Sequence, residues 1–296
     1  MDKLIYEIKP DAKMRKAFYE KVKDKASVET RLVGRSILSR DIIAYKIGRG
    51  KEHIMYVGAH HGAEYITATL LMEFILFLVE KSTRPAIYLG INSEILLQKF
   101  TFWIVPCVNP DGTELSINGI SESPLYSRQL RMNGGFDFTK WQANARGVDL
   151  NHNYSCGFAE YKAIEQNMGI GEGRTKYSGT CPESEPETRA LAGFIRSLSP
   201  GLIVSLHSQG EEIFYSPKTA RMRRLAERAA RRISYSVSIP KGTAAFGGLS
   251  DYTGEILSIP SLTVEVGRGE NPLPFDSAKG IFERILPLLY SLPTLL

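Results

Sequence analysis

Residues 53–82 carry the sequence HIMYVGAHHGAEYITATLLMEFILFLVEKS. The run 53–59 is short and apolar, as in buried strands, and a helical pattern of apolar residues follows over 64–82. A strand that is followed directly by a helix is the repeating unit of α/β folds. The stretch therefore predicts an α/β fold, with histidine and glutamate side chains gathered at the carboxyl end of a strand.

The rest of the chain repeats this alternation. Further strand-like runs lie at 41–48, 100–108, 201–207, 211–216 and 261–266, and further helix-like patterns at 11–24, 185–198, 218–234 and 276–291. Region 109–181 differs, because it is rich in Gly, Asn, Ser and Asp with little periodicity, and we expect a long functional loop there. No Pro-, Gly- or Ser-rich linker divides the 296 residues, so we expect a single domain over 1–296.

The composition is that of an ordinary globular protein, with 43% hydrophobic and 23% charged residues and a net charge of +5. The most basic segment is TARMRRLAERAARR at 219–232, which could serve as an arm for nucleic acid. Its apolar residues recur at helical spacing, however, at Leu225, Ala226, Ala229, Ala230 and Ile233. This spacing favours an amphipathic helix with a solvated basic face, and we expect no nucleic-acid partner.

Cysteine usage and hydropathy bear on the compartment. The three cysteines Cys107, Cys156 and Cys181 are far apart in sequence, which fits a reducing environment better than a disulfide framework. The apolar stretch 66–79 contains Glu73 and is shorter than the roughly 20 residues that span a bilayer. The N-terminal residues do not resemble a signal peptide. We therefore expect a cytoplasmic protein without a membrane span, and the oligomeric state stays open.

His61 and Glu64 are the first candidate metal ligands. They are three positions apart at the predicted loop-to-helix junction, so both side chains can point at one centre. A catalytic zinc ion commonly takes two His and one Glu and keeps an open position, so this pair needs one more distant ligand. The alternative is that His61 caps the helix and Glu64 only favours its N-terminus.

His207 is the candidate for the third ligand. It ends the predicted strand 201–207, and sites in α/β sheets gather at the carboxyl ends of strands. Taken alone, a histidine at a strand end is more often a structural residue. Taken with His61 and Glu64, it completes a site for one zinc ion.

Glu265 is the candidate catalytic group. It lies among β-branched residues in the predicted strand 261–266, where a buried carboxylate is costly unless it is paired or functional. A zinc peptidase needs such a carboxylate to take a proton from water and pass one to the leaving amine. A salt-bridged core glutamate is the alternative.

Five motifs in their order along the chain resemble those of the carboxypeptidase A-like zinc metallopeptidases. They are GAHHGAE at 58–64, PCVNPDG at 106–112, GVDLNHN at 147–153, LHS at 206–208 and TVE at 263–265, and the resemblance covers roughly residues 30–275. It implies a mixed, mostly parallel eight-stranded sheet flanked by helices. It also implies zinc on His61, Glu64 and His207, with Glu265 as general base and acid and 109–112 as a turn that shapes the site.

The chain departs from that family where the substrate binds. Carboxypeptidases have an Asn-Arg pair that clamps the terminal carboxylate of the substrate, whereas this chain has Asn151 and His152. An imidazole captures a carboxylate less well than the fork of a guanidinium. Thr243 stands where carboxypeptidases have a tyrosine that contacts substrate. Both differences weaken the case for ordinary exopeptidase action.

A cationic side chain should also stabilise the oxyanion of the reaction. Arg146 is our candidate for this catalytic and substrate-binding role, because it directly precedes the GVDLN segment. Arg128 and Arg131 are alternatives in the same region, and a structural role for Arg146 is a further one.

The segments WQANARGVDLN at 141–151 and VEVGRGENPLP at 264–274 resemble the bacterial γ-D-glutamyl-L-diamino acid endopeptidases. This resemblance implies hydrolysis of the bond between D-Glu and a diamino acid, such as meso-diaminopimelate, in peptidoglycan stem peptides, so peptides or muropeptides are the expected partners. The alternatives are an ordinary metallocarboxypeptidase, a zinc deacylase of acyl-amino acids, and a non-catalytic muropeptide-binding module. The intact ligand set with Glu265 disfavours the last of these.

Overall fold

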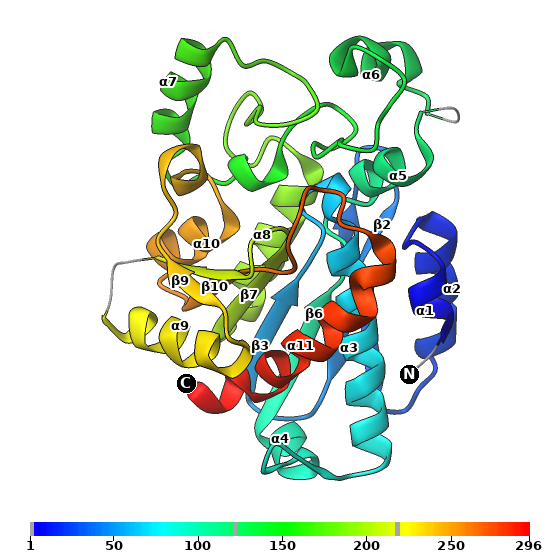
Figure 1. The fold of residues 1–296 in the computed structure, drawn as a ribbon, viewed down its shortest axis with the longest axis vertical. Helices are drawn as coiled ribbons and strands as arrows, with labels where there is room; N and C mark the ends of the chain where they lie inside the picture. Colours follow the sequence, from blue (N-terminus) through cyan, green and yellow to red (C-terminus); the bar gives the residue numbers. More distant parts are fainter. Residues whose placement is uncertain (1–2, 121–122, 217–219) are drawn as a thin grey trace.

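An eight-stranded mixed sheet forms the centre of the molecule, in the order β1-β2-β6-β3-β7-β10-β8-β9 (Figure 1). The structure is a computed structural model that describes residues 3–120, 123–216 and 220–296. The strands are β1 (Val28–Arg35), β2 (Asp41–Ile47), β3 (Glu52–Val57), β6 (Phe100–Val105), β7 (Leu202–His207), β8 (Glu212–Tyr215), β9 (Ser236–Ser238) and β10 (Ser261–Glu265). Four of the neighbouring pairs are parallel and three are antiparallel, which confirms the predicted sheet.

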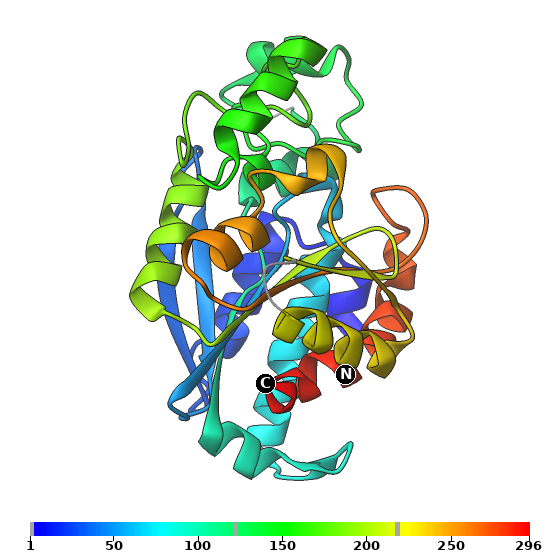
Figure 2. The ribbon, with the colours of Figure 1, turned by 90° about the vertical axis from the view of Figure 1, so that its left-hand side faces the viewer.

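Helices cover both faces of this sheet (Figures 1 and 2). One face packs against α1 (Lys3–Glu7), α2 (Ala12–Val22), α3 (Ile66–Thr83), α4 (Ser93–Lys99), α9 (Ala220–Ile233) and α11 (Ala278–Ser291). The other face packs against α8 (Pro186–Leu198) and α10 (Leu249–Asp251). A small hairpin of β4 (Ile87–Tyr88) and β5 (Ile91–Asn92) stands apart from the sheet.

The central strands are buried on both faces because alternate side chains enter two different cores. On β3, Ile54 and Tyr56 join the core that contains α3, while Met55 and Val57 join the core that contains α8. Successive side chains of a strand point to opposite faces of the sheet. A strand that is buried on both faces therefore needs an apolar residue at every position. This requirement explains the continuous apolar run that predicted the strand.

The segment Gly62–Thr83, which contains α3, is long and apolar enough to cross a membrane. The described part of the chain holds one such segment, and 89% of its apolar window is buried inside the fold. Its apolar character is therefore explained by packing against the sheet and α11.

The prediction of a long loop over 109–181 is wrong for three segments. The structure forms α5 (Pro110–Asn118), α6 (Tyr126–Asn133) and α7 (Phe158–Met168) there, which lie beyond the upper ends of the strands in Figures 1 and 2. The segment expected as a turn at 109–112 is the start of α5, where the Asn109 side chain accepts a hydrogen bond from Gly112 N at 2.8 Å. These helices are short and locally capped, so their sequences show little periodicity.

The basic segment forms α9, as its apolar spacing predicts, although residues 218–219 of the expected helix lie outside the described residues. Leu225, Ala226, Ala229, Ala230 and Ile233 are buried and the arginines lie on the opposite face. The edge strand β1 escaped prediction because it is half exposed and its polar and apolar residues do not alternate cleanly.

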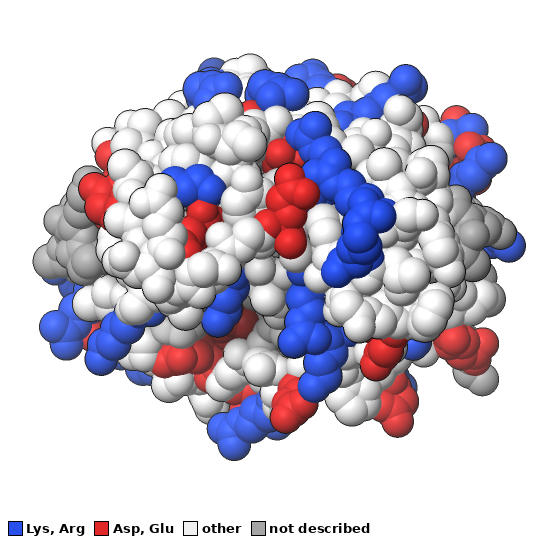
Figure 3. All heavy atoms as spheres, turned by 90° about the horizontal axis from the view of Figure 1, so that it is seen from above, with Lys and Arg blue, Asp and Glu red and all other residues white. Residues whose placement is uncertain are grey.

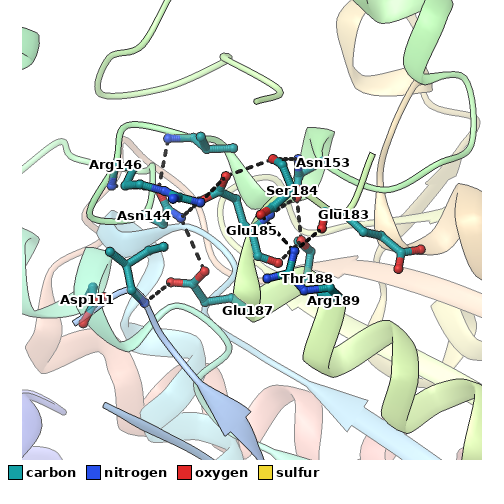
Figure 4. A network of polar contacts seen from close by, with 12 residues as sticks. Asp111, Asn144, Arg146, Asn153, Glu183, Ser184, Glu185, Glu187, Thr188 and Arg189 are labelled. Atoms are coloured by element: carbon teal, nitrogen blue, oxygen red, sulfur yellow. Dashed lines mark hydrogen bonds and ion pairs between the residues drawn. The ribbon is translucent and has the colours of Figure 1, made fainter. Parts of the chain in front are cut away.

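A polar network ties α8 to the turn between β1 and β2 (Figure 4). Glu187, in the first turn of α8, is fully buried, and one of its oxygens accepts a hydrogen bond from Ile37 N at 3.2 Å. Asn144 donates to Glu185 at 2.7 Å and to Glu187 at 3.4 Å. Burial raises the pKa of Glu187 to about 8, and the nearby Asp111 carboxylate adds to this effect.

We expect this raised pKa to make folding stability depend on pH. The folded protein holds the Glu187 proton more tightly than the unfolded chain, so stability falls as the pH rises from about 4.5 to 8. Glu187→Gln resembles the protonated carboxyl and should raise the Tm by at least about 2 °C at pH 9, with no gain at pH 4.5. Thermal unfolding at both pH values measures this difference.

Glu185→Gln is the matched control for that prediction. It loses the ion pair with Arg146 and should lower the Tm at both pH values. A Glu187→Gln variant whose Tm differs from that of the wild type by the same amount at both pH values would contradict the assignment.

Candidate metal centre and active site

Strand register places His207 and Glu265 side by side. They end the adjacent parallel strands β7 and β10 and are paired with each other in register. The neighbouring residues Leu206 and Val264 enter the core on the α3 face, so His207 and Glu265 share the opposite face. Two polar groups that are 58 positions apart in sequence (265 − 207) therefore meet at the carboxyl edge of the sheet.

His61 and Glu64 reach the same edge from β3. The chain leaves β3 and enters a 3-10 turn, Gly62–Glu64, which leads into α3. A Cβ on Gly62 would lie 2.3 Å from the Gly112 carbonyl oxygen, so this close approach of α5 requires glycine. Asn109 holds the approach together by donating to the carbonyl of His60 at 3.0 Å.

The three predicted metal ligands converge. His61 Nδ1 lies 3.0 Å from one carboxylate oxygen of Glu64, and His207 Nδ1 lies 3.0 Å from the other. One ligand atom from each residue lies within 4.8 Å of those of the other two. Two imidazoles and one carboxylate form a donor set that zinc prefers, so the residues fit the ion.

Electrostatics at two of the ligands, Glu64 and His61, favour the charged side chains despite burial. Burial alone would raise the pKa of Glu64, but His61 and His207 outweigh it and lower the value to about 2. Burial would lower the pKa of His61, but Glu64 and Asp149 outweigh it and raise that pKa well above its usual range. The Glu64 and Asp149 carboxylates that hold a proton on His61 would equally favour a metal cation in place of that proton.

Asp149 is a functional residue that sequence reasoning missed. Its Oδ1 lies 3.2 Å from His61 Nε2, and Lys176 N donates to its Oδ2 at 2.9 Å. A carboxylate behind a ligating histidine fixes the ring and its tautomer and raises its basicity. The sequence feature that points to Asp149 is its place in the GVDLN motif. It directly precedes a 3-10 turn and caps that turn.

Glu265 has the surroundings of a catalytic carboxylate. Burial raises the pKa of Glu265 well above its ordinary value, and the charge of Glu64 adds to this effect. Zinc held by the three ligands would supply a Lewis acid and a positive charge that acts against this shift. We expect Glu265 to take a proton from the attacking water and to return one to the leaving amine, and this role stays a prediction.

Arg146, the predicted oxyanion group, is engaged elsewhere (Figure 4). Its Nε donates to Oε2 of Glu185 and its Nη2 donates to Oε1, each at 3.1 Å. This fork geometry is the strong form of the Arg-carboxylate pair, so Glu185 engages Nε and Nη2 of Arg146 in a structural contact. The two alternatives both lie in α6, where Arg128 pairs with Glu172 and Arg131 is exposed.

Asn151 contacts the first residue of α10, and His152 contacts the segment just before that helix. Asn151 Oδ1 accepts from Leu249 N at 3.1 Å, and His152 Nδ1 lies 2.9 Å from the carbonyl oxygen of Phe246. The His152 ring is stacked on Tyr161 with centroids 4.0 Å apart. Their predicted role in substrate binding stays a prediction. Thr243 lies in the 3-10 turn Gly242–Ala245, three residues before Phe246.

Figure 3 shows the end of the molecule where β3, β7 and β10 finish and where the helices of 110–168 lie. Lys and Arg side chains are interspersed with Asp and Glu over this face. One row of basic side chains runs beside acidic ones, and the two signs do not separate into halves of the face.

Comparisons with known proteins agree with this geometry. Residues 16–280 match the family model described as zinc carboxypeptidase. The γ-D-glutamyl-L-diamino acid endopeptidase 1 of Lysinibacillus sphaericus is 28% identical over 86% of this chain, and the chain spans 64% of the length of that relative. The murein peptide amidase A of Escherichia coli K12 is 32% identical over 35% of this chain and 34% of its own length.

A solved structure shares the fold. Bovine thrombin-activatable fibrinolysis inhibitor superposes with a TM-score of 0.72 over 98% of this chain and 97% of its own, at 19% identity. The chain thus belongs to the zinc carboxypeptidase family. It is a zinc-dependent hydrolase, which confirms the predicted family, enzyme class and cofactor.

Loss of either histidine ligand should remove the metal. We expect His61→Ala and His207→Ala to lose bound zinc, measured by elemental analysis after dialysis, because the site then has too few ligands. His53→Ala is the control, since His53 lies near the start of β3 beside Trp103 and should leave the zinc content unchanged. Full zinc content in His207→Ala would remove His207 from the ligand set.

Glu265→Gln should keep zinc and lose activity. The amide cannot take a proton, so we expect kcat to fall by about 10³-fold or more while the zinc content stays that of the wild type. Glu52→Gln, at the exposed start of β3, should retain full kcat. Turnover by Glu265→Gln within tenfold of the wild type would exclude the general-base role.

Proposed function

We propose that this chain hydrolyses the amide bond between the γ-carboxyl group of D-Glu and a diamino acid in peptidoglycan stem peptides. Two relatives with peptidoglycan-related names support the proposal, namely the endopeptidase of Lysinibacillus sphaericus and the murein peptide amidase of Escherichia coli. The first of them matches over 86% of this chain. The family model matches residues 16–280, which include His61, Glu64 and His207.

The observation that carries the proposal is the state of His152. The carbonyl oxygen of Phe246 can only accept, so the hydrogen of the neutral ring lies on Nδ1 and its Nε2 carries a lone pair. Burial lowers the pKa of His152, so the ring is neutral at pH 7. A neutral acceptor repels a carboxylate lone pair, whereas the arginine expected in a carboxypeptidase would bind it. His152 therefore favours a substrate without a free carboxylate at this point, such as a peptide that continues beyond the diamino acid.

We further propose that the enzyme acts in the cytoplasm on muropeptides. The exposed Cys181 is a free thiol, which persists more readily in a reducing compartment.

Mass spectrometry of zinc-loaded protein with three peptides tests the substrate. We expect L-Ala-γ-D-Glu-meso-diaminopimelate-D-Ala to give the diaminopimelate-D-Ala dipeptide, and the tripeptide without D-Ala to be cut more slowly. The third peptide, in which L-Glu joined through its α-carboxyl replaces the γ-linked D-Glu, should stay intact. A chelator should stop the reaction and added zinc should restore it.

The alternatives give different products from the same peptides. Stepwise removal of C-terminal residues from the α-linked peptide alone would make the chain an ordinary metallocarboxypeptidase and overturn the proposal. Turnover of N-acyl amino acids without cleavage of any peptide would indicate a deacylase. Binding of the γ-linked peptide without cleavage by the zinc-loaded protein would indicate a muropeptide-binding module.

A further inference from the structure

Glu64 has two hydrogen-bond donors besides the histidines. Asn271 Nδ2 donates to Oε1 of Glu64 at 3.2 Å, and the backbone N–H of Ser208 donates to Oε2 at 3.2 Å. Neither donor belongs to the predicted ligand set. Each oxygen of the Glu64 carboxylate thus has one partner of its own, independent of His61 and His207.

The amide of Asn271 is held in a single orientation. Ser208 Oγ donates to Asn271 Oδ1 at 2.8 Å, and Asn271 Nδ2 also donates to the Ser208 carbonyl oxygen. The Ser208 carbonyl and the Glu64 carboxylate can only accept, so the amide nitrogen must face them. Ser208 directly follows His207, so this pair of contacts joins two metal-binding segments through Asn271.

Packing fixes the segment that carries Asn271 against the start of α3. Leu273 is buried with Ile66, and the ring of Phe275 lies 6.3 Å from that of Tyr65, centroid to centroid. Ile66 and Tyr65 directly follow Glu64 in sequence. Segment 271–275 therefore lies along residues 64–66, with Asn271 opposite the carboxylate.

We propose that Asn271 is a positioning residue for the metal centre, which holds the Glu64 carboxylate ready for zinc. A histidine nitrogen that bound a metal would no longer donate to Glu64. Among the described residues, Asn271 and the Ser208 N–H would then remain as donors to the carboxylate. A ligand oriented in advance loses less conformational freedom on binding, and partners of this kind are worth about 10- to 100-fold in metal affinity.

The position of Asn271 also connects the metal to the catalytic carboxylate. Glu265 ends β10, and Asn271 lies six residues later on the loop that follows. Val266 N donates to the His207 carbonyl oxygen at 2.8 Å, which anchors the start of this loop to β7. One loop therefore begins at the proton-transfer group and ends at the group that orients a metal ligand.

Zinc affinity tests the proposal independently of the substrate. Apoprotein competes with a chromophoric chelator for zinc at pH 7.5, and Asn271→Ala should bind zinc roughly 10- to 100-fold more weakly than the wild type. In cobalt-loaded protein, Asn271→Ala should also change the visible absorption band, because the Glu64 oxygens would no longer be held equally. A purely structural role of the loop would leave the shape of that band unaltered.

Glu270→Ala is the matched control. Glu270 neighbours Asn271 on the same loop but is exposed and pairs with Lys140, so its zinc affinity should stay within about twofold of the wild type. Thermal unfolding of each apoprotein shows whether the fold is kept. Ser208→Ala, which frees Asn271 Oδ1 but keeps the backbone N–H, should weaken zinc binding less than Asn271→Ala.

Two outcomes would overturn the proposal. One is wild-type zinc affinity in Asn271→Ala, and the other is an equal loss in Asn271→Ala and Glu270→Ala. If Asn271→Ala does not fold, Ser208→Ala decides, with weaker zinc binding as support and unchanged affinity as refutation. Failure of the proposed peptidoglycan activity would alter none of these measurements.

Discussion

The Glu64 carboxylate lies between two histidine rings, and the upper end of the fold is arranged to hold it there. A buried carboxylate is costly unless it is paired and fully hydrogen-bonded. His61, His207, Ser208 and Asn271 together supply this compensation from three separate segments of the chain. The same arrangement stabilises the charge of the Glu64 carboxylate and presents two histidine nitrogens and that carboxylate to a metal ion.

The sheet fixes the relative positions of the segments that surround Glu64. Parallel pairing of β3 with β7 and of β7 with β10 brings three strand ends to one edge and fixes their register. A one-residue slip of β10 would turn Glu265 into the core on the α3 face. Apolar side chains on both faces prevent such a slip, so the two cores determine which side chains meet at the site.

The region above the sheet depends on a second set of buried polar contacts. Asn109 joins the start of α5 to the segment of His60 and to Ala143. Asn144, which follows Ala143, donates to Glu185 and Glu187. These asparagines add to a small buried apolar cluster in the same region, which includes Phe138 and Trp141. Turns and short helices thereby lie beside the site, and hydrogen bonds to the backbone hold Asp149 and His152 in place.

The sequence by itself determined the α/β class, the strand and helix patterns of the core, and the residues His61, Glu64, His207 and Glu265 as one site. It could do so because periodicity, local spacing and motif order are written along the chain. Only the tertiary structure decided that Arg146 pairs with Glu185, that Asp149 supports His61, and that Asn271 reaches Glu64. Asn271 and Glu64 are 207 positions apart, and a contact across that separation arises from loop packing that no local pattern encodes.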